Sequence, residues 1–268
     1  MAKPLQSIAI QAPAFYGLNT QDSPTGLTEQ FALVADNCVI DQYGRIGARK
    51  GWKYKTTTNP HDLVSISEFI KADTTSEVIS SSASAIFKGV ETLVDITPAG
   101  YTVGNGQFKS VTLNNIHYMF SAGEDPLYYD GTTCAKISDS PHYHGTVPKG
   151  GIALASFGRL WVVSEDNKTI EWSDLIIGAA WTGGSTGSID FSKVWSDGSD
   201  VITGLAAHNG FLIIFGSSQI LVYQGASEPS TMSIADSIVG TGCIASESIQ
   251  ATGNDLLFLS SQGLKSFN

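Results

Sequence analysis

The sequence predicts an all-β fold: a β-propeller built from repeated antiparallel hairpins that group into four-stranded blades. Apolar and polar residues alternate over most of the chain, and β-branched and aromatic types dominate the apolar positions. Turn signals recur about every 8–12 residues, which is typical of consecutive short strands. A helix would instead repeat its apolar residues at about every third or fourth position.

Residues 152–225 show the repeat most clearly. Each half of this stretch has a short apolar strand, a turn, a very apolar strand, a polar turn and a third strand. The first turn is Phe157-Gly158-Arg159 in one half and His208-Asn209-Gly210 in the other. Asn-Gly turns between alternating runs indicate hairpins, and repetition of the unit at a fixed spacing indicates a propeller.

Five repeats start near residues 65, 110, 152, 202 and 248, a spacing close to the roughly 40–50 residues of one four-stranded blade. We therefore assign residues 61–268 to the propeller. The last repeat stops one strand after its second hairpin turn, although propellers normally close their ring. Either N-terminal strands close the ring, or the chain is an incomplete piece of a longer protein, or a neighbouring subunit covers the edge. We favour the second and third explanations.

Residues 1–60 differ from the repeat, and we assign them to an N-terminal docking or inter-subunit segment with short strands. Residues 27–37 fit either a short helix or a bent strand. Residues 38–40 and 45–48 read as two strands on either side of a turn. Prolines and glycines interrupt the first part of the segment: Pro4, Pro13, Gly17 and Pro24.

The composition is that of a globular, turn-rich protein. Of the 268 residues, 42% are hydrophobic and 15% charged, and the formal net charge is −10. This balance argues against tight binding to nucleic acid, which needs clustered Lys and Arg. The chain has three arginines (Arg45, Arg49 and Arg159), and no basic stripe is expected.

Three cysteines lie far apart in the sequence: Cys38, Cys134 and Cys243. Their odd number predicts buried, reduced thiols rather than disulfides, and without a Cys-x-x-Cys pair a thiolate zinc site is not expected. The N-terminus has no long apolar stretch of the kind that a secretory signal or a membrane span contains. We therefore expect assembly in a cytoplasm, without membrane insertion.

No residue is assigned a catalytic role, and we expect no enzyme activity, no metal site and no cofactor. His142 and His144, with Asp139 nearby, would share a metal ion only on a strand, but their surroundings read as a loop. The acidic turns at residues 173–174 and 197–200 read as solvated turns rather than calcium sites.

A glycan-binding or glycan-cleaving propeller that recognises a receptor is the alternative function. Residues 164–172 faintly resemble the Asp-box turn of sialidase-type propellers, but the glycine of that motif is missing. Sialidases hold a carboxylate with three arginines from different blades, whereas Arg45 and Arg49 are four residues apart here. Four tryptophans read as blade packing rather than sugar stacking: Trp161, Trp172, Trp181 and Trp195.

Two stretches of the sequence carry a recognisable pattern of residues. The first contains Gly17-Leu18-Asn19, Ala35, Asn37, Asp41, Gly44-Arg45-Ile46, Arg49 and Gly51. The second contains Arg159-Leu160-Trp161, Trp172-Ser173-Asp174, Gly204-Leu205 and Asn209-Gly210. With these residues the two stretches resemble the tail nozzle proteins (tail tubular or stabilisation proteins) of short-tailed, podovirus-like bacteriophages. Together the stretches cover most of the chain, although members of the family are usually longer.

The resemblance implies a structural virion protein in the phage tail. Such a subunit forms a homohexameric ring below the portal and the adaptor (head-to-tail connector), contacts tail fibres, and surrounds the channel through which DNA leaves without specific binding. It also implies docking or inter-subunit roles for seven residues: Gly17, Leu18, Asn19, Asn37, Asp41, Arg45 and Arg49. A generic propeller scaffold for protein partners fits the same sequence features.

Overall fold

The computed structural model of the chain describes residues 16–28, 30–56 and 61–267. The chain divides into two compact units, Met1–Lys55 and Thr56–Asn268. The predicted boundary at residue 60 lies outside the described residues.

The N-terminal unit contains two small sheets. Strand β1 (Gly17–Leu18) pairs in parallel with β2 (Phe31–Ala32), and β3 (Cys38–Ile40) forms an antiparallel hairpin with β4 (Ile46–Ala48). Strands this short cannot build a large apolar core. Side chains such as Val34 and Val39 therefore stay exposed.

Of the two interpretations that the sequence allows for residues 27–37, the short helix is wrong. The described part of this stretch contains turns and strand β2, and Asn37 adopts a left-handed backbone with φ of 54°. Phe31 pairs with Gly17, and its ring lies 5.7 Å from that of Tyr16. These contacts with residues more than ten positions earlier hold the stretch in an extended form, where a short isolated helix would be marginal.

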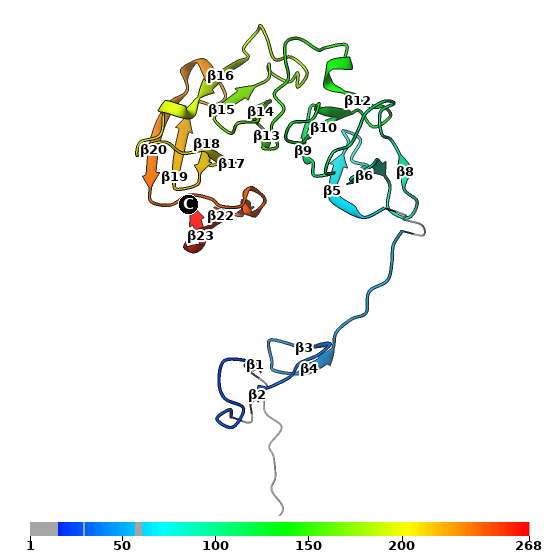
Figure 1. Cartoon of the computed structure of the whole chain (residues 1–268), viewed down its shortest axis with the longest axis vertical. Coiled ribbons are helices and arrows are strands. Elements are labelled where there is room, and N and C mark those ends of the chain that lie inside the picture. Colours follow the sequence, from blue (N-terminus) through cyan, green and yellow to red (C-terminus); the bar gives the residue numbers. More distant parts are fainter. Residues whose placement is uncertain (1–15, 29, 57–60, 268) are drawn as a thin grey trace, which may run out of the picture. The chain divides into compact units, whose positions relative to one another are not determined.

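The second unit is a β-propeller of five antiparallel blades, which confirms the predicted fold class (Figure 1). Blade 1 contains β5 (Leu63–Ile70), β6 (Ser76–Ser82), β7 (Ile86–Lys88) and β8 (Val94–Asp95). Blade 2 contains β9 (Lys109–Leu113), β10 (Ile116–Phe120), β11 (Leu127–Tyr129) and β12 (Cys134–Lys136). Blade 3 contains β13 (Ala153–Ser156), β14 (Arg159–Val163), β15 (Thr169–Trp172) and β16 (Gly187–Asp190).

Blade 4 contains β17 (Ile202–His208), β18 (Phe211–Gly216), β19 (Gln219–Gln224) and β20 (Ser233–Val239). Blade 5 has three described strands, β21 (Gln250–Thr252), β22 (Asp255–Ser260) and β23 (Gly263–Phe267). The first strands of the blades begin at residues 63, 109, 153, 202 and 250. Four short 3₁₀ helices lie between strands: η1 (Ile137–Asp139), η2 (Phe191–Lys193), η3 (Pro229–Thr231) and η4 (Ser246–Ser248).

Blades 2, 3 and 4 join their first two strands by the same kind of two-residue turn. Both turn residues have positive φ in each case: Asn114 and Asn115, Phe157 and Gly158, Asn209 and Gly210. Two consecutive left-handed residues give the turn geometry that matches the twist of an antiparallel hairpin, and Asn and Gly adopt it at least cost.

The second strand of each middle blade is buried on both faces, which explains its nearly continuous apolar sequence. In β14, Leu160 and Val162 belong to the core shared with blade 2. Trp161 and Val163 point the other way, into the core shared with blade 4. Because neighbouring side chains of a strand face opposite sides, one strand contributes to two cores at once.

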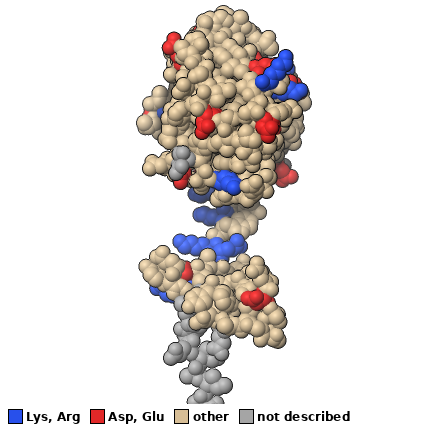
Figure 2. All heavy atoms as spheres, turned by 90° about the vertical axis from the view of Figure 1, so that its left-hand side faces the viewer, with Lys and Arg blue, Asp and Glu red and all other residues tan. Residues whose placement is uncertain are grey.

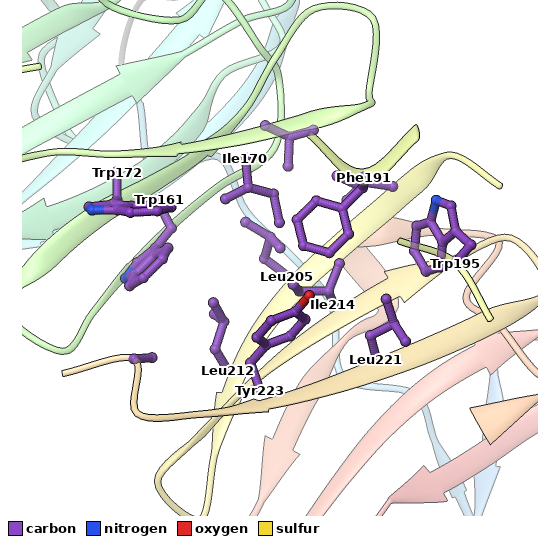
Figure 3. Close-up of a cluster of buried hydrophobic side chains, with 13 residues drawn as sticks. Trp161, Ile170, Trp172, Phe191, Trp195, Leu205, Leu212, Ile214, Leu221 and Tyr223 are labelled. Carbon is purple, nitrogen blue, oxygen red and sulfur yellow. The ribbon is translucent and has the colours of Figure 1, made fainter. Parts of the chain in front are cut away.

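The largest core lies between blades 3 and 4 (Figure 3). The Trp161 and Trp172 rings of blade 3 lie 5.3 Å apart, centroid to centroid. Phe191, from η2, packs 5.9 Å from the ring of Tyr223 in blade 4. The remaining side chains labelled in the figure close the layer: Ile170, Trp195, Leu205, Leu212, Ile214 and Leu221.

Three further cores join the other neighbouring blades. The core between blades 1 and 2 contains Phe69 and Met119, and the core between blades 2 and 3 contains Phe120. Phe215 and Phe258, with ring centroids 5.0 Å apart, represent the core of blades 4 and 5. Cys243 is buried in this last core as expected, whereas Cys38 and Cys134 are half-buried; all three are free thiols.

In the described parts of the chain, no helix has the length and apolar character that a membrane crossing would require.

His117 makes the stability of the propeller pH-dependent. This side chain of β10 is 1% exposed, and its Nε2 and Nδ1 lie 3.0 and 3.2 Å from the hydroxyls of Ser67 and Thr112. Burial lowers the pKa of His117 to about 4. The unfolded chain, with an ordinary histidine pKa of about 6.5, therefore binds more protons than the folded chain between those two values.

The contribution of His117 is complete above about pH 6.5 and is lost as the pH falls toward 4. Urea unfolding should show a loss of about 2 kcal/mol between pH 7.5 and pH 5 from this residue. The variant His117→Gln, which has no titrating ring, should lose correspondingly less over the same interval. An equal loss in both proteins would contradict the assignment.

Candidate interaction surfaces

The seven residues predicted to dock the subunit lie in the N-terminal unit, in its two small sheets or directly next to their strands. Gly17 and Leu18 form β1, and Asn19 follows directly. The Asn19 Oδ1 atom accepts hydrogen bonds from the backbone N–H of Gln21 at 3.0 Å and of Asp22 at 3.2 Å. Asn19 therefore fixes the turn that leaves β1, while Leu18 stays exposed.

Asp41 organises the turn of the β3–β4 hairpin. Its carboxylate accepts from the backbone N–H groups of Tyr43 and Arg45, both at 2.9 Å, and from Arg45 Nε at 2.9 Å. The backbone N–H of Arg45 is the main cause that lowers the pKa of Asp41. The Arg45 guanidinium also lies 5.2 Å from the centre of the Tyr43 ring. The sequence pattern Asp-x-x-Gly-Arg thus builds one rigid, exposed turn.

Hydrogen bonds between Asn37 and Arg49 hold the open end of the same hairpin together. The Arg49 backbone N–H donates to the Asn37 carbonyl at 2.8 Å, and Arg49 Nη2 donates to Asn37 Oδ1 at 3.3 Å. The structure therefore brings Asn37, Asp41, Arg45 and Arg49 together on one hairpin. A hollow of about 510 Å³ beside the hairpin turn is also lined by Gly17, so the two groups of predicted residues meet there.

The net charge of the whole chain does not reveal a group of cations that begins in this hairpin and continues beyond it. Between residues 45 and 55 there are five Lys and Arg and no Asp or Glu: Arg45, Arg49, Lys50, Lys53 and Lys55. All five are exposed (Figure 2). The expectation of no basic stripe is wrong for this stretch, because the local count of lysines was hidden by the acidic total.

The Trp172-Ser173-Asp174 motif of blade 3 fixes a loop instead of forming an open site. Asp174 Oδ1 accepts from Ser185 N at 3.1 Å and from Ser185 Oγ at 2.7 Å. The Ser185 carbonyl in turn accepts from Trp172 Nε1 at 3.0 Å. Buried Arg159 donates through Nη1 to the Ser173 carbonyl at 3.1 Å. Arg159 and Asp174 are therefore packing and loop-holding residues.

Asp200 performs the same task in blade 4. Its carboxylate accepts from the backbone N–H of Val201 at 2.8 Å, of Ser217 at 3.0 Å and of Ser218 at 2.9 Å, and from both serine hydroxyls. Burial opposes ionisation, but these donors outweigh it and lower the pKa of Asp200. The prediction of simply solvated acidic turns is thus wrong for Asp174 and Asp200: Asp174 accepts protein hydrogen bonds through Oδ1, and Asp200 through both carboxylate oxygens.

Residues 164–172 form the turn that follows β14, together with strand β15. Ser164 Oγ donates to Asp166 Oδ1 at 2.5 Å and accepts from the Thr169 N–H at 2.9 Å. Asp166 also accepts from the Lys168 N–H at 3.1 Å. These bonds hold the turn between β14 and β15, which is the structural role that such turns have in other propellers.

His142 and His144 lie outside the strands. The backbone N–H of His142 donates to Ser140 Oγ at 3.3 Å, and His144 forms an isolated bridge with Ala180. Within the described residues, no three His, Cys, Asp or Glu side chains converge on a common point that could hold a metal ion.

The four propeller tryptophans are packing residues, as the sequence predicts. Trp161, Trp172, Trp181 and Trp195 are at most 7% exposed and belong to the cores between blades. None of them presents a free face to a sugar ring, so the main observation behind the glycan-binding alternative is lost.

Blades 1 and 5 each present one apolar face with no neighbouring blade among the described residues (Figure 1). On β5, Phe69 packs against blade 2, while Ile66 and Ile70 lie on the opposite face, and Ile66 is 69% exposed. On blade 5, Leu259 pairs in register with Leu264, which is also 69% exposed. Strand β23 has no described partner along its outer edge, unlike the third strand of every other blade.

No protein-family model and no curated protein matches the sequence. Among solved structures, BBS1N from the crystal structure of its complex with ARL6DN is similar with a TM-score of 0.53 and 11% identity, over 86% of this chain and 72% of that chain. A chain of the nidogen/laminin complex has a TM-score of 0.45 and 13% identity, over 78% of this chain and 76% of that one. The AfRom2 CNH domain has a TM-score of 0.44 and 11% identity, over 85% and 69%. At these identities the likeness concerns the fold alone.

The hydrogen bonds of Asp200 predict a large effect of its removal. Asp200→Ala should lower the free energy of unfolding by about 2–3 kcal/mol, because several donors on the β18–β19 turn lose a charged acceptor. Asp73→Ala is the matched control, since Asp73 holds an exposed turn through Thr75 only. Its loss, measured by the same chemical denaturation, should be much smaller. Equal losses would show that Asp200 does not hold blade 4 together.

Proposed function

We propose that the chain is a structural virion protein: a subunit of the tail nozzle ring of a short-tailed phage, attached to the portal–adaptor complex. The observation that carries the proposal is the N-terminal hairpin, where the residues that resemble the nozzle family form one exposed, pre-organised surface. Hydrogen bonds from Arg45 to the Asp41 carboxylate hold both side chains and the turn backbone in one conformation. Little conformational entropy is therefore lost when a partner binds this surface.

The open blades support a role in an assembly. Ile66 and Ile70 on one side, and Leu259 and Leu264 on the other, are aliphatic side chains that a closed propeller would bury. Exposed apolar faces of this kind are typical of surfaces that are covered in a larger complex.

The charge distribution fits a conduit that does not retain DNA along its length. Six of the fifteen Lys and Arg, and four of the twenty-five Asp and Glu, lie in residues 1–55. The propeller unit therefore carries nine cations against twenty-one anions. A surface with this excess of carboxylates repels a phosphate backbone at short range.

Binding to the purified portal–adaptor complex tests the proposal. We expect the wild-type chain to co-sediment with the complex. The double variant Asp41→Ala/Arg45→Ala should bind on the order of tenfold more weakly, or worse, because the hairpin turn loses its lock. Its propeller should unfold at the same denaturant concentration as the wild type.

Asp73→Ala serves as the control, because it removes a comparable exposed turn carboxylate from blade 1. This variant should bind the complex like the wild type. The proposal fails if the wild-type chain ignores the portal–adaptor complex, or if the hairpin variant binds as well as the control.

A further inference from the structure

Residues 49–55, Arg-Lys-Gly-Trp-Lys-Tyr-Lys, form a segment in which cations alternate with exposed aromatic rings. We call it the basic–aromatic segment. It contains four Lys and Arg and no acidic residue. No described carboxylate forms an ion pair with Lys50, Lys53 or Lys55. The positive charge of these lysines is therefore available to an external ligand.

The two aromatic rings of the segment are far more exposed than packing residues. Trp52 is 72% and Tyr54 81% exposed, whereas the four tryptophans of the propeller are at most 7% exposed. The Trp52 and Tyr54 rings meet edge to face, with centroids 5.0 Å apart and planes at 88°. In this arrangement ring faces remain open to solvent, where a planar ligand can stack.

We propose that the basic–aromatic segment binds single-stranded nucleic acid without sequence preference. Proteins of this binding class combine cations that follow the phosphate backbone with aromatic side chains on which bases stack. Lys50, Lys53 and Lys55 supply the phosphate contacts, and Trp52 and Tyr54 supply the stacking platform. Arg49 is held by Asn37, which anchors the start of the segment to the hairpin.

The acidic composition of the chain does not prevent such binding. At physiological ionic strength, charges farther apart than about 8 Å are largely screened. The ligand therefore responds to the local charge of residues 49–55, and much less to the formal net charge of −10. The inference stands on this segment alone and does not depend on the proposed role in a phage tail.

Nucleic acid fits the segment better than a membrane surface does. Interfacial binding normally uses an amphipathic helix with a continuous apolar face, and residues 49–56 contain no helix. In the sequence Trp-Lys-Tyr-Lys, a lysine instead follows each aromatic residue. That order matches a ligand in which phosphates and bases also alternate.

Tryptophan fluorescence of the full chain tests the proposal directly, because Trp52 is the exposed tryptophan among four buried ones. A mixed-sequence DNA oligonucleotide of about 16 nucleotides covers the usual site size. Its addition should quench the emission of Trp52. The quench should vanish in Trp52→Phe, while binding of the labelled oligonucleotide, followed by anisotropy, should persist.

Three further double variants separate the contribution of charge from that of stacking. Lys53→Gln/Lys55→Gln should reduce the slope of log K against log salt by about 1.4, since each lost phosphate contact accounts for about 0.7. The double variant Lys168→Gln/Lys193→Gln removes the same charge from exposed propeller positions and should leave the slope unchanged. Trp52→Ala/Tyr54→Ala should weaken binding on the order of tenfold or more without changing the slope.

Several outcomes would overturn the proposal. Absence of binding to the oligonucleotide by the wild-type chain is one, and equal sensitivity of both lysine double variants is another. Binding to polyglutamate as tight as to the oligonucleotide would show that charge alone acts. A blue shift of Trp52 with phosphatidylserine vesicles, together with no response to the oligonucleotide, would assign the segment to a lipid surface instead.

Discussion

The packing of one blade on the next is the interaction on which the propeller depends. Alternate side chains of a strand such as β14 enter different cores, so each middle blade is held from both sides. Five blades in one row have four such interfaces. The outer faces of blades 1 and 5 therefore keep the same apolar character without the same burial, as Ile66 and Leu264 show. An assembly that covers these faces would complete a pattern that the chain itself repeats four times.

Several carboxylates of this chain hold turns. Asp41 in the hairpin of the N-terminal unit, and Asp174 and Asp200 in the propeller, each accept several backbone and hydroxyl hydrogen bonds. Their pKa values are lowered because these donors stabilise the ionised form. These three carboxylates therefore have a structural role. The strongest local excess of positive charge, in residues 49–55, lies apart from these turns in the sequence.

The strands could be predicted because their signals are local. Turns such as Asn209-Gly210 need only their own backbone preference, and the apolar runs between turns follow from burial on one or both faces. Residues 27–37 were ambiguous because Phe31 is held by β1, a partner that no local pattern reveals. The propeller tryptophans were predicted as packing residues because strands surround them in the sequence.

The polar contacts of the blades could not be predicted in the same way. Asp174 finds its partner Ser185 eleven positions later in the sequence, and Asp200 reaches Ser217 and Ser218 in a later hairpin. Such pairs depend on the fold rather than on spacing. The basic–aromatic segment was readable from the sequence, but a net charge summed over the whole chain hides a short stretch of opposite sign.

The particle mass of the purified chain, measured by light scattering and checked by negative-stain imaging, tests the central claim most directly. If the chain is the proposed nozzle subunit, it should form closed rings, alone or on the adaptor, and the resemblance to the nozzle family implies about six copies in each ring. A compact monomer that stays monomeric in the presence of the portal–adaptor complex would contradict the account.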